Sequence, residues 1–463
     1  MSPVRVALQT LGCRVNQADT IALADALRSR SATLVDSSEI ADIYVLNTCT
    51  VTHAADADAR KIARRMKRLN PSAQVVVTGC YAQVAPDALT ALPEIDLVVG
   101  NDGKHGLADQ LLGLHPTQQG DAHGATTHGA ATQEAPGAAT DVAPRGRRGR
   151  SWPARVRPAS SRITALPETH TRPFLKVQDG CDYTCAFCII PKARGVSRSF
   201  SVDDVARQAA RYAELGAVEL VLTGIHLGHW GRDLIPRVPF HVMLAQLADR
   251  LAREGQVRRI RLGSVEPNEV TPELIALVVE HPLLVEHLHV PLQSGDDDVL
   301  KRMRRLYSTD QYARVLTDLR AALPTAALGA DVLVGHPGED AASFKRTLAL
   351  LDDLDWTYLH VFPFSARKGT PSAAMPDHVS NAAKGERVQT LVRRSEVRRH
   401  LFHRRAVGRE QEWLVMKPAG DGFNALSRTY IPARINSDTR LRTGDLVRAS
   451  AHDAGPGHMQ VQL

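Results

Sequence analysis

The sequence predicts an α/β protein with three folded parts: an N-terminal parallel α/β sheet, a central partial barrel of six strand–helix units and a small C-terminal all-β barrel. Three observations predict this fold class. The 463 residues suffice for about three domains at the usual ~150 residues each. Strand-like apolar runs alternate with helical patterns along most of the chain, as in parallel sheets. After residue 408 the pattern changes to short strands separated by Gly, Asn, Asp and Pro.

The N-terminal part is expected at residues 1–112 and reads as alternating strands and helices, which predicts a parallel sheet with covering helices. The expected strands are 4–12, 41–48, 73–79 and 95–100, and the expected helices are 20–30 and 56–69. Residues 113–168 follow, and their stretch 115–150 contains no Ile, Leu, Met, Phe, Trp or Tyr. Such a segment buries too little apolar surface to offset its ordering entropy, so we expect a flexible linker.

The central part is expected at residues 169–385, because six strand-like runs are separated there by helical patterns. These runs are 174–178, 218–223, 258–263, 286–292, 328–335 and 357–363. Six such units fit a partial (β/α)6 barrel with its active site at the carboxyl ends of the strands. A basic helical connector is expected at 386–407 and a small barrel at 408–463, with strands in EWLVMK, RTYIPARI, DLVRASA and MQVQL.

The composition excludes several classes of protein. Hydrophobic residues make up 43% and charged residues 23%, which excludes wholesale disorder and fibrous repeats. No run of eighteen apolar residues occurs, and the start MSPVRVALQT lacks the basic and apolar regions of a secretion signal. We therefore expect a cytoplasmic protein with no membrane partner and with reduced cysteines. The net charge of +7 favours a polyanionic partner.

Three of the six cysteines lie together in CDYTCAFC, directly after the first expected barrel strand. Cys181, Cys185 and Cys188 form a compact CxxxCxxC loop, and three thiolates can hold three irons of a 4Fe–4S cube while the fourth iron stays open. A structural zinc site would need a fourth Cys or His nearby, and the next His along the chain is His226. The spacing favours an iron–sulfur cluster.

This loop resembles the hallmark of the radical SAM superfamily, CxxxCx(aromatic)C, with Phe187 in the aromatic place. The resemblance implies that the open iron binds S-adenosyl-L-methionine (SAM) and that an electron from the cluster cleaves SAM to a 5′-deoxyadenosyl radical. It also implies SAM contacts at the ends of the second, third and fourth barrel strands. The residues concerned are Thr223, Gly224, Ser264, Glu266 and Gln293. From the residues alone, helix-entry turns and helix caps explain several of these positions equally well.

The other three cysteines are dispersed, but each directly follows an expected strand of the N-terminal sheet. Cys13, Cys49 and Cys80 are 36 and 31 residues apart, which is about one βαβ unit. Because parallel strands end at the same edge of a sheet, three thiols are expected to converge there. A lone cysteine is usually a small buried hydrophobe, but three at strand ends favour a second 4Fe–4S cluster.

Asn16, Asn47, Thr48 and Thr78 lie beside these cysteines and either donate hydrogen bonds to cluster sulfurs or serve in turns and caps.

Together the motifs resemble the methylthiotransferase branch of the radical SAM enzymes. They are LGCRVNQ, NTCTVT, TGCYAQ, DGCDYTCAFCIIP, HVPLQSGDD and FSARKGTP, and the C-terminal module looks like a TRAM domain. LGCRVN is most similar to the enzymes that act on tRNA threonylcarbamoyladenosine, since the isopentenyladenosine enzymes typically read FGCQMN. The resemblance implies a methylthio group added at C2 of N6-threonylcarbamoyladenosine-37. It also implies an electron donor, a sulfur source and sulfur presented by the second cluster.

Two features depart from the pattern of the family. His336, in VGHPGED, stands where the family commonly has Phe, and the segment 113–168 is longer than expected. Three other functions remain open: a methylthiotransferase for isopentenyladenosine in tRNA, one for an aspartate of a ribosomal protein, and a non-enzymatic iron–sulfur protein that binds RNA or transfers electrons. The open-iron cysteine loop argues against the last of these.

Basic side chains that could meet an anticodon stem-loop lie in two runs. Residues 60–68 carry six basic residues and no acidic ones, and residues 386–409 carry eight Arg against two Glu, whereas 408–463 carry a net charge of only +1. A charge run is often just a solvated helix face. Phe423 and Tyr430 are further candidates, for base stacking. The candidate RNA contacts are Arg60, Arg64, Arg65, Arg68, Arg398, Arg399 and Arg434.

Overall fold

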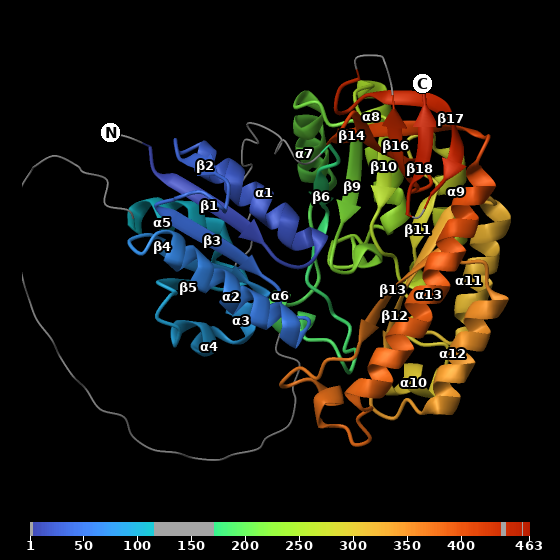
Figure 1. Cartoon of the computed structure of the whole chain (residues 1–463), viewed down its shortest axis with the longest axis horizontal. Coiled ribbons are helices and arrows are strands. Elements are labelled where there is room, and N and C mark those ends of the chain that lie inside the picture. Colours follow the sequence, from blue (N-terminus) through green and yellow to red (C-terminus); the bar gives the residue numbers. More distant parts are fainter. Residues whose placement is uncertain (1–2, 115–170, 437–440, 456) are drawn as a thin grey trace, which may run out of the picture.

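The computed structural model describes residues 3–114, 171–436, 441–455 and 457–463. An N-terminal sheet domain lies beside a larger barrel, and a small β-barrel sits at one end of the larger barrel (Figure 1). This architecture confirms the predicted fold class. The expected linker at 113–168 lies, from residue 115 on, outside the described residues. None of the described helices is both long and apolar enough to cross a bilayer.

The N-terminal domain has one five-stranded, fully parallel sheet in the order β2-β1-β3-β4-β5. Its strands are β1 (Arg5–Thr10), β2 (Thr33–Val35), β3 (Ile43–Thr48), β4 (Gln74–Gly79) and β5 (Leu97–Val99). Four of them match expected strands. The edge strand β2 was missed because three residues, TLV, are too few to form a pattern.

Helices cover both faces of this sheet. One face is covered by α1 (Arg14–Arg28) and α5 (Leu107–Leu114), and α5 follows the 3-10 helix η1 (Asn101–Gly106). The apolar layer between these helices and the sheet includes Val6, Val45 and Leu107. On the other face α2 (His53–Leu69) buries its Ala59, Ala63 and Met66 stripe, beside α3 (Cys80–Val84) and α4 (Pro86–Thr90). Because the sheet is buried on both sides, its inner strands β3 and β4 carry the apolar runs IYVL and VVV.

The central domain contains the six predicted barrel strands. They are β6 (Phe174–Lys176), β9 (Glu219–Thr223), β10 (Arg259–Leu262), β11 (His287–His289), β12 (Ala327–Val334) and β13 (Tyr358–Pro363). They form two parallel three-stranded sheets, and isolated bridges from Ile260 to Leu284 and from Ser264 to His289 join the two along β10 and β11. The result is an open, partial barrel.

Helices follow the barrel strands and pack on the outside around one large apolar core. They are α7 (Val202–Glu214), α8 (Phe240–Glu254), α9 (Pro272–Glu280), α10 (Asp297–Arg302), α11 (Thr309–Ala322) and α12 (Ala341–Asp353). The expected basic connector at 386–407 is the greater part of one long helix, α13 (Asn381–Ala406), which Ser380 caps. Its buried Ser395 hydroxyl binds the backbone N–H of Leu359 at 2.8 Å, which ties the helix to β13.

The C-terminal module is a closed five-stranded barrel. Its strands are β14 (Glu410–Ala419), β15 (Gly422–Ser427), β16 (Pro432–Asn436), β17 (Leu446–Ala454) and β18 (Met459–Gln462). The four expected strands are present, but GFNALS also forms a strand, β15. That segment was missed because its Gly, Asn and Ser residues interrupt the apolar pattern and resemble the turns between the expected strands.

This small barrel docks at the amino ends of the central strands. The guanidinium of Arg259 donates to Leu426 O (3.1 Å) and Glu412 O (2.6 Å), and that of Arg261 donates to Ser427 O at 3.1 Å. Both arginines are fully buried. The carboxyl ends of the strands therefore remain on the side away from the small barrel.

Candidate active site

The thiols of Cys181, Cys185 and Cys188 share one loop after the first barrel strand. The loop runs from β7 (Gln178–Asp179) to α6 (Ile190–Arg194), ahead of β8 (Arg198–Ser199). Burial raises the pKa of Cys181 to about 12 and that of Cys188 to about 11, and other thiols of the loop act in the same direction. The three thiols thus lie on one loop, within residues 181–188.

Hydrogen-bond donors surround these sulfurs. The backbone N–H of Tyr183 and the Nδ1 atom of His226 each lie 3.4 Å from Cys181 Sγ. The guanidinium of Arg305 donates to Cys185 Sγ at 3.3 Å. Burial raises the pKa of Cys185, and the positive charge of Arg305 opposes this increase. Arg305 was not predicted as a site residue. Its signal in the sequence was the basic run KRMRR at 301–305.

The predicted SAM contacts lie at the carboxyl ends of the strands around this loop. Thr223 is buried and ends β9, and a Cβ atom on Gly224 would lie 2.8 Å from Gln178 Oε1, so only glycine leaves this approach open. Ser264 is exposed and bridges to β11. Gln293 adopts a positive φ of 64°.

Two of the predicted residues already have partners. Glu266 forms an ion pair with Arg305, and burial raises the pKa of Glu266 while Arg305 opposes the shift. Phe187 meets His336 edge to face, with ring centroids 6.4 Å apart. His336 is fully buried, binds Ser372 Oγ through Nε2 at 2.8 Å, and has its pKa lowered to about 4 by burial. The histidine that replaces the usual Phe therefore packs as an aromatic neighbour of the cysteine loop.

The dispersed cysteines converge at the carboxyl edge of the N-terminal sheet. Cys13 directly precedes α1, Cys49 follows β3 and Cys80 begins α3. Burial raises the pKa of Cys49 to about 11, and the thiols of Cys80 and Cys13 contribute to the increase. At Gly12, which has φ +96°, a Cβ atom would lie 2.9 Å from Cys49 Sγ, so the Cys13 loop needs glycine to approach this closely.

The polar residues beside these thiols brace the loops. Asn16 Nδ2 donates to the carbonyls of Leu11 (2.8 Å) and Thr48 (2.9 Å), and Thr48 Oγ1 donates to Thr78 O at 2.5 Å. Asn47 likewise donates to the Asn16 carbonyl. Among the described residues, the side-chain donor to a sulfur of this set is Asn101, whose Nδ2 lies 3.7 Å from Cys80 Sγ.

Known proteins resemble both the N-terminal domain and the central barrel. Residues 5–100 match the model of the uncharacterized protein family UPF0004, and residues 175–351 match that of the radical SAM superfamily. The chain is 38% identical over 391 residues to the threonylcarbamoyladenosine tRNA methylthiotransferase MtaB of Bacillus subtilis, covering 84% of this chain and 80% of that protein. It is a radical SAM methylthiotransferase.

Two further proteins, one a sequence relative and one a solved structure, resemble this methylthiotransferase. The tRNA-2-methylthio-N(6)-dimethylallyladenosine synthase of Novosphingobium aromaticivorans is 31% identical over 471 residues, covering 100% of this chain and 98% of that protein. Among solved structures, the radical SAM methyltransferase TsrM of Kitasatospora setae has a TM-score of 0.53 at 17% identity, covering 80% of this chain and 74% of that chain. The likeness to TsrM shows that the two proteins share a fold.

Membership of the superfamily implies SAM and one 4Fe–4S cluster, and the cysteine loop fits that cluster. It offers three sulfur ligands, and the N–H groups of Tyr183 and Arg305 that donate to Cys181 and Cys185 match the hydrogen bonds that tune cluster sulfurs. Burial disfavours an isolated thiolate at this position, whereas a bound metal favours the deprotonated form. The methylthiotransferase therefore has a thiol set suited to binding metal.

A buried charge network joins the two cysteine-bearing regions. Arg194, 3% exposed, binds Asp179 at 2.9 Å and Asp19 at 3.0 Å, and it also donates to Asn16. Lys104 and Lys176 both reach Asp19. Burial would raise the pKa of Asp19, but these cations hold it well below its usual value. Sequence reasoning missed the network because its members are scattered along the chain.

A cavity of about 690 Å³ lies beside this network, among α1, α5 and α7. Its walls include Asp19, Lys104, Arg194 and Phe200 but none of the six cysteines.

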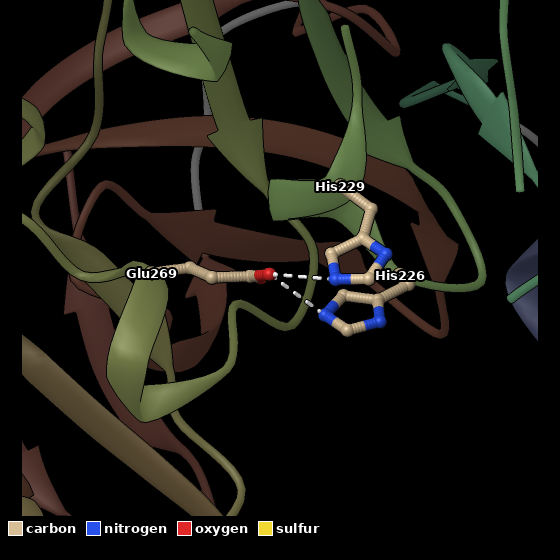
Figure 2. Close-up of side chains that lie close together, drawn as sticks. All are labelled: His226, His229 and Glu269. Atoms are coloured by element: carbon tan, nitrogen blue, oxygen red, sulfur yellow. Dashed lines mark ion pairs between the residues drawn. The ribbon is translucent and has the colours of Figure 1, made fainter. Parts of the chain in front are cut away.

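Two stacked histidines lie next to the cysteine loop. His226 and His229, at the 3-10 helix η2 (Leu227–His229), have ring centroids 3.6 Å apart and planes at 14°. Their Nε2 atoms lie 2.9 and 3.3 Å from Oε1 of Glu269, in the 3-10 helix η3 (Pro267–Glu269) (Figure 2). Burial lowers the pKa of His229 to about 4. The sequence had pointed only to His226, as the next His after the loop.

The predicted RNA-contacting arginines are distributed over α2, α13 and β16. Arg64, Arg65 and Arg68 are exposed on α2, where Arg64 pairs with Glu94 at 3.4 Å and Arg65 donates to Gln9 Oε1 at 2.8 Å. Arg60 donates to the Tyr81 hydroxyl at 2.8 Å. On α13 Arg399 is exposed.

Arg398 lies over the Trp356 ring at 5.1 Å and binds backbone carbonyls of α12, so it holds α13 in place. Arg434 pairs with Asp421 at 2.9 Å. Phe423 is half-buried against the core of the small barrel. The Tyr430 ring packs on His287 of the large barrel, with ring centroids 4.4 Å apart, and is therefore part of the interface between the two barrels.

Proposed function

We propose that this chain is the tRNA (N6-L-threonylcarbamoyladenosine(37)-C2)-methylthiotransferase. The observation that carries the proposal is the pair of three-thiol sets at the carboxyl ends of two neighbouring parallel sheets, in a chain 38% identical to an MtaB protein. Four proteins with the name MtaB, from four different bacteria, are 29–38% identical to this chain. This repeated match supports threonylcarbamoyladenosine as the substrate.

In this proposal Cys181, Cys185 and Cys188 hold the superfamily cluster. When bound, the cluster and SAM supply the radical chemistry that removes the hydrogen from C2 of the adenine. The chain's own part is to place and shield the reactants. Arg305 holds Glu266 and Cys185 in fixed positions. The residues proposed to face SAM are Phe187, Thr223, Gly224, Ser264, Glu266 and Gln293.

We assign a second 4Fe–4S cluster to Cys13, Cys49 and Cys80, where sulfur for transfer would be presented. The convergence of the three thiols and the Asn101 contact to Cys80 support this assignment. The proposed partners are a sulfur source for this set, an electron donor for the other, and the anticodon stem-loop of tRNA.

An iron count tests the second cluster. Anaerobically reconstituted Cys49→Ser should contain about half the iron of the wild type, because one of two four-iron clusters is lost. Cys185→Ser should lose a similar amount, and the double variant should contain almost no iron. If Cys49→Ser keeps the full iron content of the wild type, Cys49 does not help to hold a cluster.

Each part of the fold has its own proposed role. Residues 1–112 carry the second cluster, residues 169–385 form the SAM barrel, residues 386–407 belong to the helical connector, and residues 408–463 form a TRAM-like barrel. The exposed arginines of α2 and α13, Arg64, Arg65, Arg68 and Arg399, are proposed to meet phosphates.

Nucleoside analysis tests the function directly. tRNA from cells with and without the gene is digested and compared by mass spectrometry, and the methylthio form of threonylcarbamoyladenosine should disappear without the gene. Loss of the methylthio form of isopentenyladenosine, or of a modified ribosomal aspartate in a peptide map, would assign the enzyme to another substrate. Unchanged nucleosides and peptides would contradict a methylthiotransferase role in those cells.

A further inference from the structure

His226, His229 and Glu269 form a compact buried group that neither thiol set explains. They are 5%, 3% and 8% exposed. The three side chains come from the turns after two adjacent barrel strands and point toward one another (Figure 2). The Tyr183 ring closes one side and meets both imidazoles edge to face. Its centroid lies 4.3 Å from that of His226 and 4.7 Å from that of His229.

The His226 ring lies between two electron-rich atoms. Its Nδ1 atom faces Cys181 Sγ at 3.4 Å, and its Nε2 atom lies 2.9 Å from a carboxylate oxygen of Glu269. The ligand atoms of His226, His229 and Glu269 all lie within 4.8 Å of one another, which is close enough for one metal ion to contact all three.

Several atoms of the group also lack partners. Among the described residues, His226 Nε2, both ring nitrogens of His229 and Oε2 of Glu269 are buried and make no hydrogen bond. Native proteins rarely leave so many polar atoms unsatisfied in one place without a ligand or ion. Arg232 reaches Oε1 of Glu269 at 3.3 Å, but its side chain is half exposed, and it offers nothing to the histidines.

We propose that His226, His229 and Glu269 bind a first-row divalent cation, for which zinc is a suitable probe. Two imidazoles and one carboxylate are a common donor set for such ions. Zinc bonds of about 2.0–2.2 Å in a tetrahedral arrangement place neighbouring donor atoms roughly 3.4 Å apart. The distances from Glu269 Oε1 to the two Nε2 atoms, 2.9 and 3.3 Å, are close to this value.

Binding requires a small local adjustment. The two rings are stacked at 14°, so their lone pairs run side by side, and His229 must turn about its terminal torsion for them to converge. That torsion is broad in histidine. Next to the group lies a cavity of about 410 Å³ whose walls include Gly228, Arg232 and Glu269, and a water molecule there can complete the coordination.

This site goes beyond the proposed function and does not depend on it. The donors are nitrogen and oxygen, whereas both cluster sites are built from sulfur. The ion would fix the His226 ring so that Nδ1–H donates to Cys181, as ligating histidines usually donate their second ring N–H.

Metal analysis of the full-length, anaerobically prepared holoenzyme tests the site. The protein is incubated with excess zinc chloride, freed of unbound metal by gel filtration and analysed for zinc and iron. His229→Phe keeps a stacked ring but removes both nitrogens, and Glu269→Gln keeps the size of the side chain but removes its charge. His241→Asn is the matched control, since His241 lines the same cavity outside the group.

The wild type and His241→Asn should retain about one equivalent of zinc more than either variant, at equal iron content. Zinc taken up by vacant thiols is the same in every form, because all keep six cysteines. Equal zinc in all forms, or no zinc in the wild type, overturns the proposal. If a variant also loses iron, zinc-edge X-ray absorption of the wild type decides: nitrogen and oxygen neighbours support the site, and sulfur neighbours alone overturn it.

Discussion

At the scale of single residues, Arg194 is the cation that pairs with two buried carboxylates between the two cysteine-bearing regions. Its guanidinium is shared between Asp19 and Asp179. Arg194→Met keeps much of the volume but leaves two buried carboxylates with less countercharge, so we expect the free energy of unfolding to fall by about 3–5 kcal/mol. Urea denaturation measures the change. Arg207→Met, which removes an ion pair whose arginine side chain is 59% exposed, should cost under about 1 kcal/mol.

Asp25 gives the stability a pH dependence. It is fully buried in α1, with Oδ2 unpaired and Arg28 at 3.3 Å, and burial raises its pKa from 3.8 to about 7. The folded chain then keeps a proton that the unfolded chain releases, so stability is lost as pH rises from about 4 to about 7. Asp25→Asn, which resembles the protonated acid, should be more stable than the wild type at pH 8, by up to about 4 kcal/mol. The difference should vanish near pH 4 in urea titrations, and a constant difference would exclude Asp25 as the source.

At the scale of elements, the cysteine loop depends on Gly180. This residue has φ +73°, and a Cβ atom there would lie 1.9 Å from the carbonyl oxygen of Val196. Gly180→Ala must therefore move the backbone next to Cys181, and we expect the reconstituted protein to lose about half its iron. Gly216→Ala separates strain from clash, since Gly216 also has a positive φ, +88°, but a Cβ atom there meets nothing within 4 Å. That variant should keep its iron, and loss of iron in both would point to general unfolding.

The elements also show what local patterns can predict. The six barrel strands and the grouping of Cys13, Cys49 and Cys80 followed from alternation and spacing, because parallel strands of one sheet must end at one edge. The three residues of β2 are too few for a periodic signal, and the Gly, Asn and Ser residues of β15 interrupt one. Arg305, Asn101 and the stacked histidines were missed because their roles arise from packing between segments far apart in the chain.

At the scale of the whole molecule, buried arginines join the two barrels. Arg261 binds Glu219 at 2.7 Å on its own side and the carbonyls of Ser427 and Arg428 across the interface. Burial would raise the pKa of Glu219, but three arginines lower it to about 2. Arg261→Met leaves this carboxylate and two carbonyls underpaired, so we expect the small barrel to loosen, with a loss of about 3–5 kcal/mol.

Hydrogen–deuterium exchange measures this loosening. Exchange in β15 and β16 should become faster in Arg261→Met, while the N-terminal sheet should stay protected. Arg448→Met removes an arginine that is 72% exposed and should leave exchange unchanged. Equal protection of the small barrel in both variants would show that the arginine contacts do not hold it.

The residues of the buried network around Asp19 are synthesised at very different times. Asp19 lies 85 residues before Lys104, 157 before Lys176 and 175 before Arg194. N-terminal domains generally fold first during synthesis on the ribosome. When Cys13, Cys49 and Cys80 have all been synthesised, Lys176 and Arg194, two of the three cations that pair with Asp19, have not. Lys176 lies in β6 and Arg194 ends α6, so both belong to the barrel. The buried network of Asp19 can therefore be completed only after the first strand of the barrel and α6 have been synthesised.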